Sequence, residues 1–202
     1  MLIFYRQRLV LLAVPKTGTT AYHRALASHA DMVIANPPAL KHAPVYRYNR
    51  FFRPMFERVC GAEMVLAAVM REPVSWLGSW YRYRKREALI GTPQSTKELS
   101  FDQFVLGYLR GEKPPYAAVG SQAQFLKAQP NGTAVSHLFQ YEEPLALHRF
   151  LEERLDFSFE LQRLNVSPPE PLDLSPDIAA KLRRKYAADF ALYASISGEA
   201  TA

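Results

Sequence analysis

The sequence predicts an α/β protein with three layers, α/β/α, around a mainly parallel central sheet. Its 202 residues, of which 49% are hydrophobic, suit one domain spanning residues 1–202 with a buried core. Short apolar runs alternate with segments of helical character. Such β-α-β alternation is typical of a sheet that carries helices on its faces. The chain contains no internal repeat and no low-complexity tract.

The first half of the chain contains two long apolar runs that indicate buried strands. A shorter apolar run closes at Asn36-Pro37-Pro38, where prolines end regular structure. Between these runs the polar and apolar residues favour helices. The elements expected here are strands over residues 9–14, 32–35 and 64–70, and helices over residues 21–27, 44–59 and 76–87.

In the second half of the chain, serines mark where helices begin. Ser100 is a candidate cap for a helix that runs to Arg110, and Ser121 begins a short helix. Ser175 is expected to cap the last helix, with Pro176 in its first turn. The other expected elements are a strand over residues 133–140, a helix from residue 144 to about residue 156, and a proline-rich surface crossing over residues 157–174.

The formal net charge of +6 favours anionic ligands, and the same charge is common among nucleic-acid-binding proteins. The single cysteine, Cys60, excludes an internal disulfide and fits a reducing compartment. No Cys/His cluster has metal-ligand spacing. The first eight residues lack the order of a signal peptide, and no apolar run approaches the roughly 20 residues of a membrane span. We therefore expect a cytoplasmic protein without a bound metal.

A basic loop follows the first long apolar run. Residues 14–20 have the sequence VPKTGTT and stand between a predicted strand and a predicted helix. The first N–H groups of a helix have no internal partners, and the helix dipole adds partial positive charge there. Gly18 lets the backbone approach a ligand closely, Lys16 adds a full charge, and the threonines add hydroxyl groups. The loop therefore predicts a site for a nucleotide phosphate.

The residue order in this loop differs from that of the ATP- and GTP-binding P-loop. The P-loop motif is G-x-x-x-x-G-K-[ST], with its lysine after the second glycine. Here Lys16 precedes Gly18, and Leu11 stands where the first glycine would fall. The loop instead resembles the 5′-phosphosulfate loop of sulfotransferases, enzymes that use 3′-phosphoadenosine 5′-phosphosulfate (PAPS).

A second stretch resembles the same family. The apolar run 64–70 ends in Arg71-Glu72-Pro73, and Ser79 follows Arg71 by eight positions. In sulfotransferases an arginine and a serine at this spacing hold the 3′-phosphate of the nucleotide. A guanidinium group offers a planar fork of donors suited to phosphate, and open α/β sheets bind ligands at the carboxyl ends of their strands. The cofactor-binding residues that the resemblance implies are Lys16, Thr17, Gly18, Thr19, Thr20, Arg71 and Ser79.

The resemblance implies a fold related to the P-loop nucleotide kinases and the transfer of a sulfuryl group from PAPS to an acceptor hydroxyl. The nucleotide product is 3′-phosphoadenosine 5′-phosphate (PAP). Lys16 would also be catalytic, because a cation beside the bridging oxygen stabilises the departing phosphate. In relatives the serine of the second motif holds the lysine back until the acceptor binds, a role that would fall to Ser79. The protein's own cations neutralise the sulfonate, so the reaction needs no metal.

The acceptor hydroxyl must lose a proton, and His42 is the predicted general base. The loop 40–44 follows the second predicted strand, so it is expected at the same sheet edge as Lys16. Histidine has an ordinary pKa of about 6.5, which suits a base near neutral pH. In the family, the base commonly falls a few tens of residues after the loop lysine. Lys41 is expected to hold the acceptor or the sulfonate, and Glu72 is the next candidate base.

The acceptor class stays open at this point. Basic and aromatic residues interleave after His42, and this face is either an acceptor site for an acidic sugar or a phenol, or a core stripe with solvated arginines. Ser121-Gln122 resembles a segment that lines the site of carbohydrate sulfotransferases, which favours a carbohydrate acceptor. The interleaved residues are Tyr46, Arg47, Tyr48, Arg50, Phe51, Phe52 and Arg53.

Two other function classes remain as alternatives to the sulfotransferase. A nucleotide or small-molecule kinase on a related fold would require magnesium and ATP. A non-catalytic module that binds nucleic acid or another polyanion would bind with a steep dependence on salt. The basic cluster 82–86 fits such a module on composition. Its position after the second motif favours a nucleotide or an acidic acceptor, so we expect no nucleic acid and no membrane among the partners.

Overall fold

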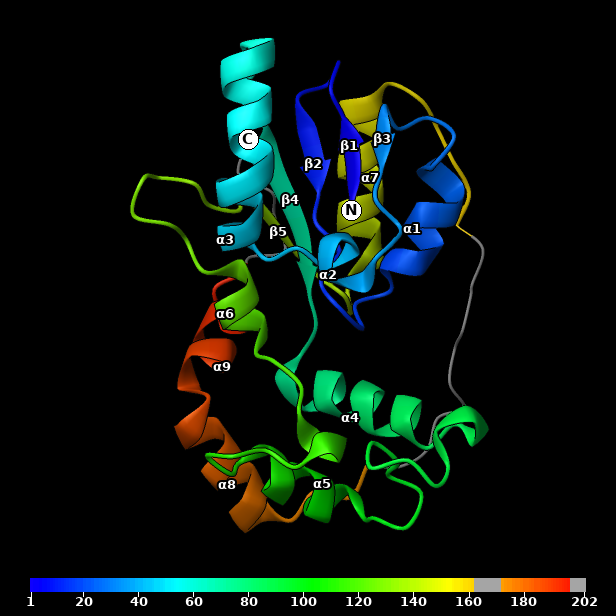
Figure 1. The fold of residues 1–202 in the computed structure, drawn as a ribbon, viewed down its shortest axis with the longest axis vertical. Coiled ribbons are helices and arrows are strands. Elements are labelled where there is room, and N and C mark those ends of the chain that lie inside the picture. Colours follow the sequence, from blue (N-terminus) through cyan, green and yellow to red (C-terminus); the bar gives the residue numbers. More distant parts are fainter. Residues whose placement is uncertain (162–171, 197–202) are drawn as a thin grey trace.

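The computed structural model describes residues 1–161 and 172–196 of the chain. Its centre is a five-stranded mixed sheet with the strand order β3-β1-β2-β4-β5 (Figure 1). β1 pairs antiparallel with β2 and with β3, whereas β4 pairs parallel with β2 and with β5. The strands are β1 Leu2–Phe4, β2 Leu9–Leu11, β3 Met32–Val33, β4 Val65–Met70 and β5 His137–Gln140.

The expected mainly parallel sheet is therefore correct only in part. The α/β class is confirmed, and the strands β2, β4 and β5 form a parallel group. The antiparallel part arises from β1, which was not expected and which turns back into β2 as a hairpin over residues 5–8. This turn places Arg8 at φ 53°, a left-handed conformation that few residues other than glycine adopt.

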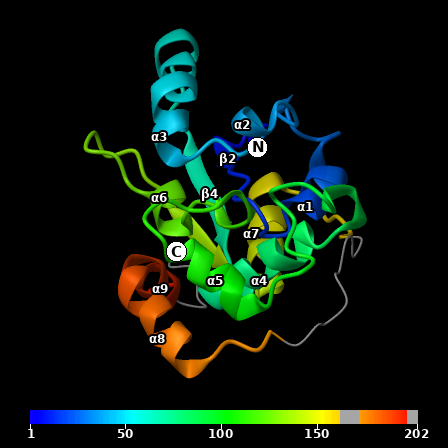
Figure 2. The ribbon, with the colours of Figure 1, turned by 60° about the horizontal axis from the view of Figure 1, so that its bottom comes forward.

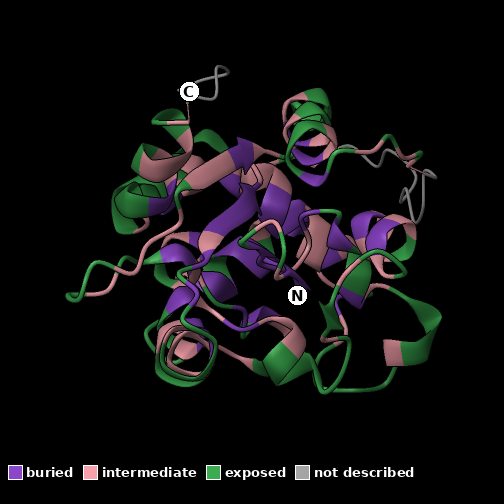
Figure 3. Cartoon of the chain, turned by 90° about the horizontal axis from the view of Figure 1, so that it is seen from above, coloured by how far each residue is buried: buried purple, intermediate pink, exposed green. Residues whose placement is uncertain are grey.

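Helices cover both faces of the sheet, so the expected layers are present. On one face, Tyr22 and Leu26 of α1 and Leu151 of α7 pack against Phe4 and Leu11 of the strands. The other face packs against the helix that begins at Val45 and against α6. The buried residues concentrate in the strands and on the inner sides of these helices (Figure 3). The helices flanking the sheet are α1 Thr19–Leu26, α2 Pro38–Lys41, α3 Val45–Arg47, α6 Gln122–Leu126 and α7 Pro144–Leu155.

A third apolar cluster lies beyond the carboxyl ends of β4 and β5. It joins α4, α5 and α8 through Trp76, Phe104 and Leu182, and these helices lie together below the sheet in Figure 1. These helices cover the edge of the sheet where the predicted ligand site lies. The elements of this part are α4 Pro73–Arg84, the 3-10 turns Glu87–Leu89 and Pro115–Ala117, α5 Phe101–Tyr108, α8 Pro176–Lys185 and α9 Ala187–Ala194.

The helix expected over residues 44–59 is present but is largely π-helical. After α3 it continues as two π-helical segments, Tyr48–Phe52 and Met55–Val59. π-Helices are rare and usually last a single turn. This helix extends past the sheet in both Figure 1 and Figure 2. Its buried side, with Val45, Tyr48 and Phe56, anchors it to the core.

Of the two expected serine caps, Ser100 is confirmed and Ser175 is not, and Ser121 begins a short helix as expected. Ser100 caps α5 in a reciprocal capping box with Gln103, and the Ser121 hydroxyl accepts from Gln124 N at the start of α6. Ser175 stands before α8, but its hydroxyl bonds Asp102 instead of capping the helix. Most of the expected surface crossing over residues 157–174 lies outside the described residues. Within the described ranges, no helix is long and apolar enough to cross a bilayer.

Candidate anion-binding site

The loop after β2 adopts a left-handed conformation at two positions. Lys16 has φ 67° and Gly18 has φ 74°, and Gly18 is the residue directly before α1. The Thr17 hydroxyl donates to Val14 O at 2.9 Å, and this hydrogen bond holds the two ends of the turn together. α1 has no side-chain cap and no acidic residue in its first turn. Ala21 N donates to Gly18 O at 3.1 Å, and the N–H groups before it at the start of α1 are suited to an anion. Thr19 is buried in the first turn and Thr20 is exposed.

A hydrogen bond joins the loop to α4 and so brings the two predicted motifs together. The Trp76 indole Nε1 donates to Pro15 O at 2.8 Å. Glu72 caps α4, because its carboxylate accepts from Ser75 N at 2.7 Å. Since β2 and β4 are direct parallel neighbours, the residues that follow them meet at one edge of the sheet. Lys16 and Arg71 therefore belong to one site.

Four cations gather at this edge: Lys16, Arg71, Arg82 and Arg86. Burial above all, together with the charges of Arg86, Arg71 and Arg82, lowers the pKa of Lys16 to about 8. Among residues 1–161 and 172–196, no carboxylate forms an ion pair with any of the four. Gathered cations repel one another unless an anion lies among them. The arrangement is therefore suited to a multiply charged anion.

The Lys16 ammonium lies on aromatic rings. Its Nζ is 4.2 Å from the ring centroid of Tyr83 and 5.8 Å from that of Trp80. The Cζ of Arg86 is 4.7 Å from the centroid of the same Tyr83 ring. A cation over an aromatic face gains electrostatic energy without losing its charge. The sequence analysis did not predict that Tyr83 and Trp80 would contact the Lys16 ammonium.

Arg71 is fixed on three sides. Its Nε donates to Ser75 Oγ at 2.8 Å, and its Cζ lies 4.3 Å from the ring centroid of Tyr141. Its peptide group bonds the side chain of Gln122 through both N–H and C=O. Burial lowers the pKa of Arg71 from its ordinary value. The two terminal nitrogens of its guanidinium have no hydrogen-bond partner in the described parts of the chain.

The serine that bonds Arg71 is Ser75, whereas the sequence pointed to Ser79. The two serines are four residues apart on α4 and so share one face of the helix. Ser79 is half-buried and makes no side-chain hydrogen bond within the described residues. Its hydroxyl is therefore available on the side of α4 that carries the bond between Arg71 and Ser75.

His42 ends α2, and its ring Nδ1 is 2.7 Å from Ala13 O. Because a carbonyl oxygen only accepts, Nδ1 must carry the hydrogen, and Nε2 then holds the free lone pair of a neutral ring. Burial is the largest cause that lowers the pKa of His42 from its ordinary value. His42 is thus held near the loop after β2, but no hydrogen bond in the described parts joins it to Lys16 or Arg71.

Tyr141 is a site residue that the sequence reasoning missed. It follows β5 directly, and its N–H donates to Met70 O at 2.8 Å. A Cβ added to Gly18 would lie 3.0 Å from Tyr141 Cε2, so the loop and the ring are in close contact. The rule that placed Lys16 and Arg71 at the ends of parallel strands points equally to Tyr141, because the third strand of the parallel group ends there.

The basic and aromatic residues of the projecting helix divide into two groups. Tyr48 is buried and Phe52 packs against the core, whereas Tyr46 and Phe51 are exposed with Arg47 and Arg50 stacked beside them. The helix thus has a core stripe on one side and a basic-aromatic surface on the other, and an acceptor site on that surface stays a prediction.

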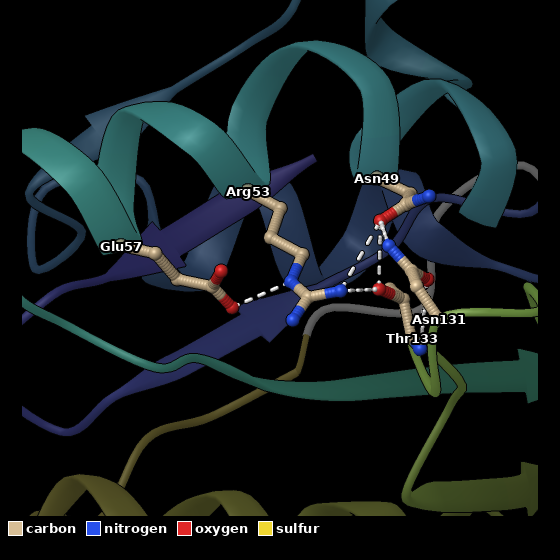
Figure 4. Close-up of polar contacts among 5 residues, drawn as sticks. All are labelled: Asn49, Arg53, Glu57, Asn131 and Thr133. Atoms are coloured by element: carbon tan, nitrogen blue, oxygen red, sulfur yellow. Dashed lines mark hydrogen bonds and ion pairs between the residues drawn. The ribbon is translucent and has the colours of Figure 1, made fainter.

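Arg53 of the same helix belongs to a separate polar cluster at the amino end of β4 (Figure 4). It pairs with Glu57 at 2.5 Å and donates to Thr133 Oγ1 at 2.7 Å, while the Thr133 hydroxyl and Asn131 both donate to Asn49 Oδ1. The cluster borders a cavity of about 200 Å³. Its polar atoms satisfy one another, so it fastens the loop before β5 to the helix.

In the described ranges, no group of three or more His, Cys, Asp or Glu side chains is arranged to hold a metal ion. Comparison with known protein families finds no family that matches this chain. No curated protein matches it either.

Proposed function

We propose that this protein is a sulfotransferase that moves a sulfuryl group from PAPS to an acceptor hydroxyl, with a carbohydrate as the acceptor class. The observation that carries the proposal is the pairing of two anion sites at one sheet edge. One is the Lys16 loop at the start of α1, and the other is Arg71, which follows β4 and donates to Ser75 of α4. A nucleotide with a 5′-phosphosulfate and a 3′-phosphate carries two anionic groups for these two sites.

The residues supply the chemical steps that such a transfer needs. His42 Nε2 accepts the proton of the acceptor hydroxyl, whose oxygen attacks sulfur in line with the leaving phosphate. The new O–S bond forms as the S–O bond to the 5′-phosphate breaks, and PAP leaves with that electron pair. Lys16 stabilises the charge that develops on the bridging oxygen. The lowered pKa of His42 keeps its ring neutral, and so able to accept a proton, at neutral pH.

The test is thermal-shift stabilisation of the protein by PAP, compared with ADP and ATP, each with and without magnesium. A ligand that binds only the folded state raises the melting temperature. A magnesium-independent shift with PAP that exceeds the shift with ADP is the expected result. A shift confined to ATP with magnesium would refute the proposal and favour a kinase. Binding of any polyanion with a steep loss in salt would favour the non-catalytic module.

A further inference from the structure

A buried amide holds the peptide group of Arg71. Gln122 Oε1 accepts from Arg71 N at 2.9 Å, and Gln122 Nε2 donates to Arg71 O at 2.7 Å. The side chain of Gln122 is 1% exposed. An N–H group needs an acceptor and a carbonyl needs a donor, so only one orientation of the amide satisfies both. The amide therefore fixes the position of the Arg71 backbone where β4 ends.

A buried carboxylate in turn holds Gln122. Asp189 of α9 accepts from Gln122 N at 2.8 Å, from Ala123 N at 3.1 Å and from Ser121 Oγ at 2.7 Å. Asp189 is 5% exposed and forms no ion pair with a described residue. Its charge is satisfied by donors at the start of α6, which is a favourable place for an anion. Displacing α6 would leave the Asp189 carboxylate buried without hydrogen-bond donors, which is energetically costly.

We propose that Asp189 and Gln122 form a positioning relay for Arg71, in which α9 sets the place of α6 and α6 sets the place of the guanidinium. The relay holds the backbone, Ser75 holds Nε, and Tyr141 lies against the face of the group. Within the described residues, the two terminal nitrogens of the guanidinium keep no hydrogen-bond partner, and they are the part that grips a phosphate in a bidentate way. The relay makes α9, more than 100 residues away in sequence, a determinant of recognition at the 3′-phosphate.

This inference rests on the proposed function for its ligand, and its test separates the two. The ligands are PAP and adenosine 5′-monophosphate (AMP), which differ only in the 3′-phosphate. The affinity of each is measured by calorimetry for the wild type, for Gln122→Leu, for Arg71→Ala and for the double variant that carries both substitutions. Gln103→Leu is the matched control, because Gln103 makes a capping contact in α5 and none with Arg71.

We expect Gln122→Leu to lower the preference for PAP over AMP roughly tenfold or more, since it leaves Arg71 without its backbone partners. The affinity for AMP should change little, and the control should keep the full preference. The effects of Gln122→Leu and Arg71→Ala on this preference should not add, because both act through one guanidinium. Equal losses for PAP and AMP, or additive effects, would overturn the relay. A wild type without a preference for PAP would overturn the proposed function instead.

A second measurement needs no ligand and tests the relay even if the Gln122→Leu protein fails to fold. Asp189→Asn keeps an oxygen for the α6 N–H groups but removes the charge, and it touches no atom of Arg71. Hydrogen exchange of the Arg71 amide should be severalfold faster in this variant than in the wild type, because the acceptor Gln122 loosens. Unchanged exchange at Arg71 would overturn the relay.

Discussion

The pKa of Lys16 gives the proposed nucleotide site a dependence on pH that can be calculated. In the free protein, burial and three neighbouring arginines bring this pKa to about 8, from an ordinary value of 10.5. A bound phosphate favours the charged form and restores a higher pKa. The protonated fraction of Lys16 in the free protein falls roughly tenfold between pH 7 and pH 9. The affinity for PAP should fall by the same factor, roughly tenfold, because the complex keeps its proton.

Calorimetric titration with PAP at pH 7, 8 and 9 measures this effect. A phosphate ester has its second pKa near 6, so the charge of the ligand stays constant over this range. Lys16→Arg is the matched variant, because arginine remains charged at every pH used. Its affinity for PAP should be flat from pH 7 to pH 9. A flat wild type, or the same decline in Lys16→Arg, would refute the assignment of Lys16 as the titrating phosphate ligand.

Two further substitutions test the base and the loop. His42→Ala should lower kcat by roughly 10²–10⁴-fold and leave the Kd for PAP unchanged. The control is His29→Ala, which removes an exposed histidine stacked on Phe157 and should leave both constants unchanged. A drop in PAP affinity with an unchanged kcat would contradict the role of His42 as the base. Gly18→Ala should lower the free energy of unfolding by about 1–3 kcal/mol, because its φ is 74° and its Cβ would crowd Tyr141. Gly61→Ala, at φ 60° with open space around it, carries the backbone strain alone, so in denaturant titrations it should lose less stability and should keep PAP binding.

Much of the fold could be predicted because the signals were local. β2 and β4 are short apolar runs that indicate buried strands, and Ser100 with Gln103 forms a capping box that marks the start of α5. β1 was missed because the hairpin turn that follows it, residues 5–8, lacks the glycine, asparagine or aspartate that usually marks such a turn. The antiparallel edge of the sheet follows from that hairpin, so the sheet was predicted only in part.

The site divides in the same way between local and distant contacts. Lys16 and Arg71 were expected together because each follows a strand of the parallel group, and strand ends meet at one edge. The ring of Tyr83 under the Lys16 ammonium and the amide of Gln122 on the Arg71 peptide are contacts between residues 51 or more positions apart. No spacing rule in the sequence links such pairs, because the tertiary packing of α4 and α6 decides them.

The π-helical turns give the segment after α3 room to absorb a change in length. A π turn holds one more residue than an α turn, so Tyr48–Phe52 adds a residue to the helix without adding a full turn. Deleting one residue there would let that turn relax to α-helical pitch, and the relaxed turn would absorb the loss. The later residues would keep their faces, with Phe56 in the core and Val59 exposed. The same deletion in an α-helical stretch would rotate every later residue by about 100° around the helix axis. Homologous chains should therefore vary in length in this segment more readily than in the α-helices of the fold.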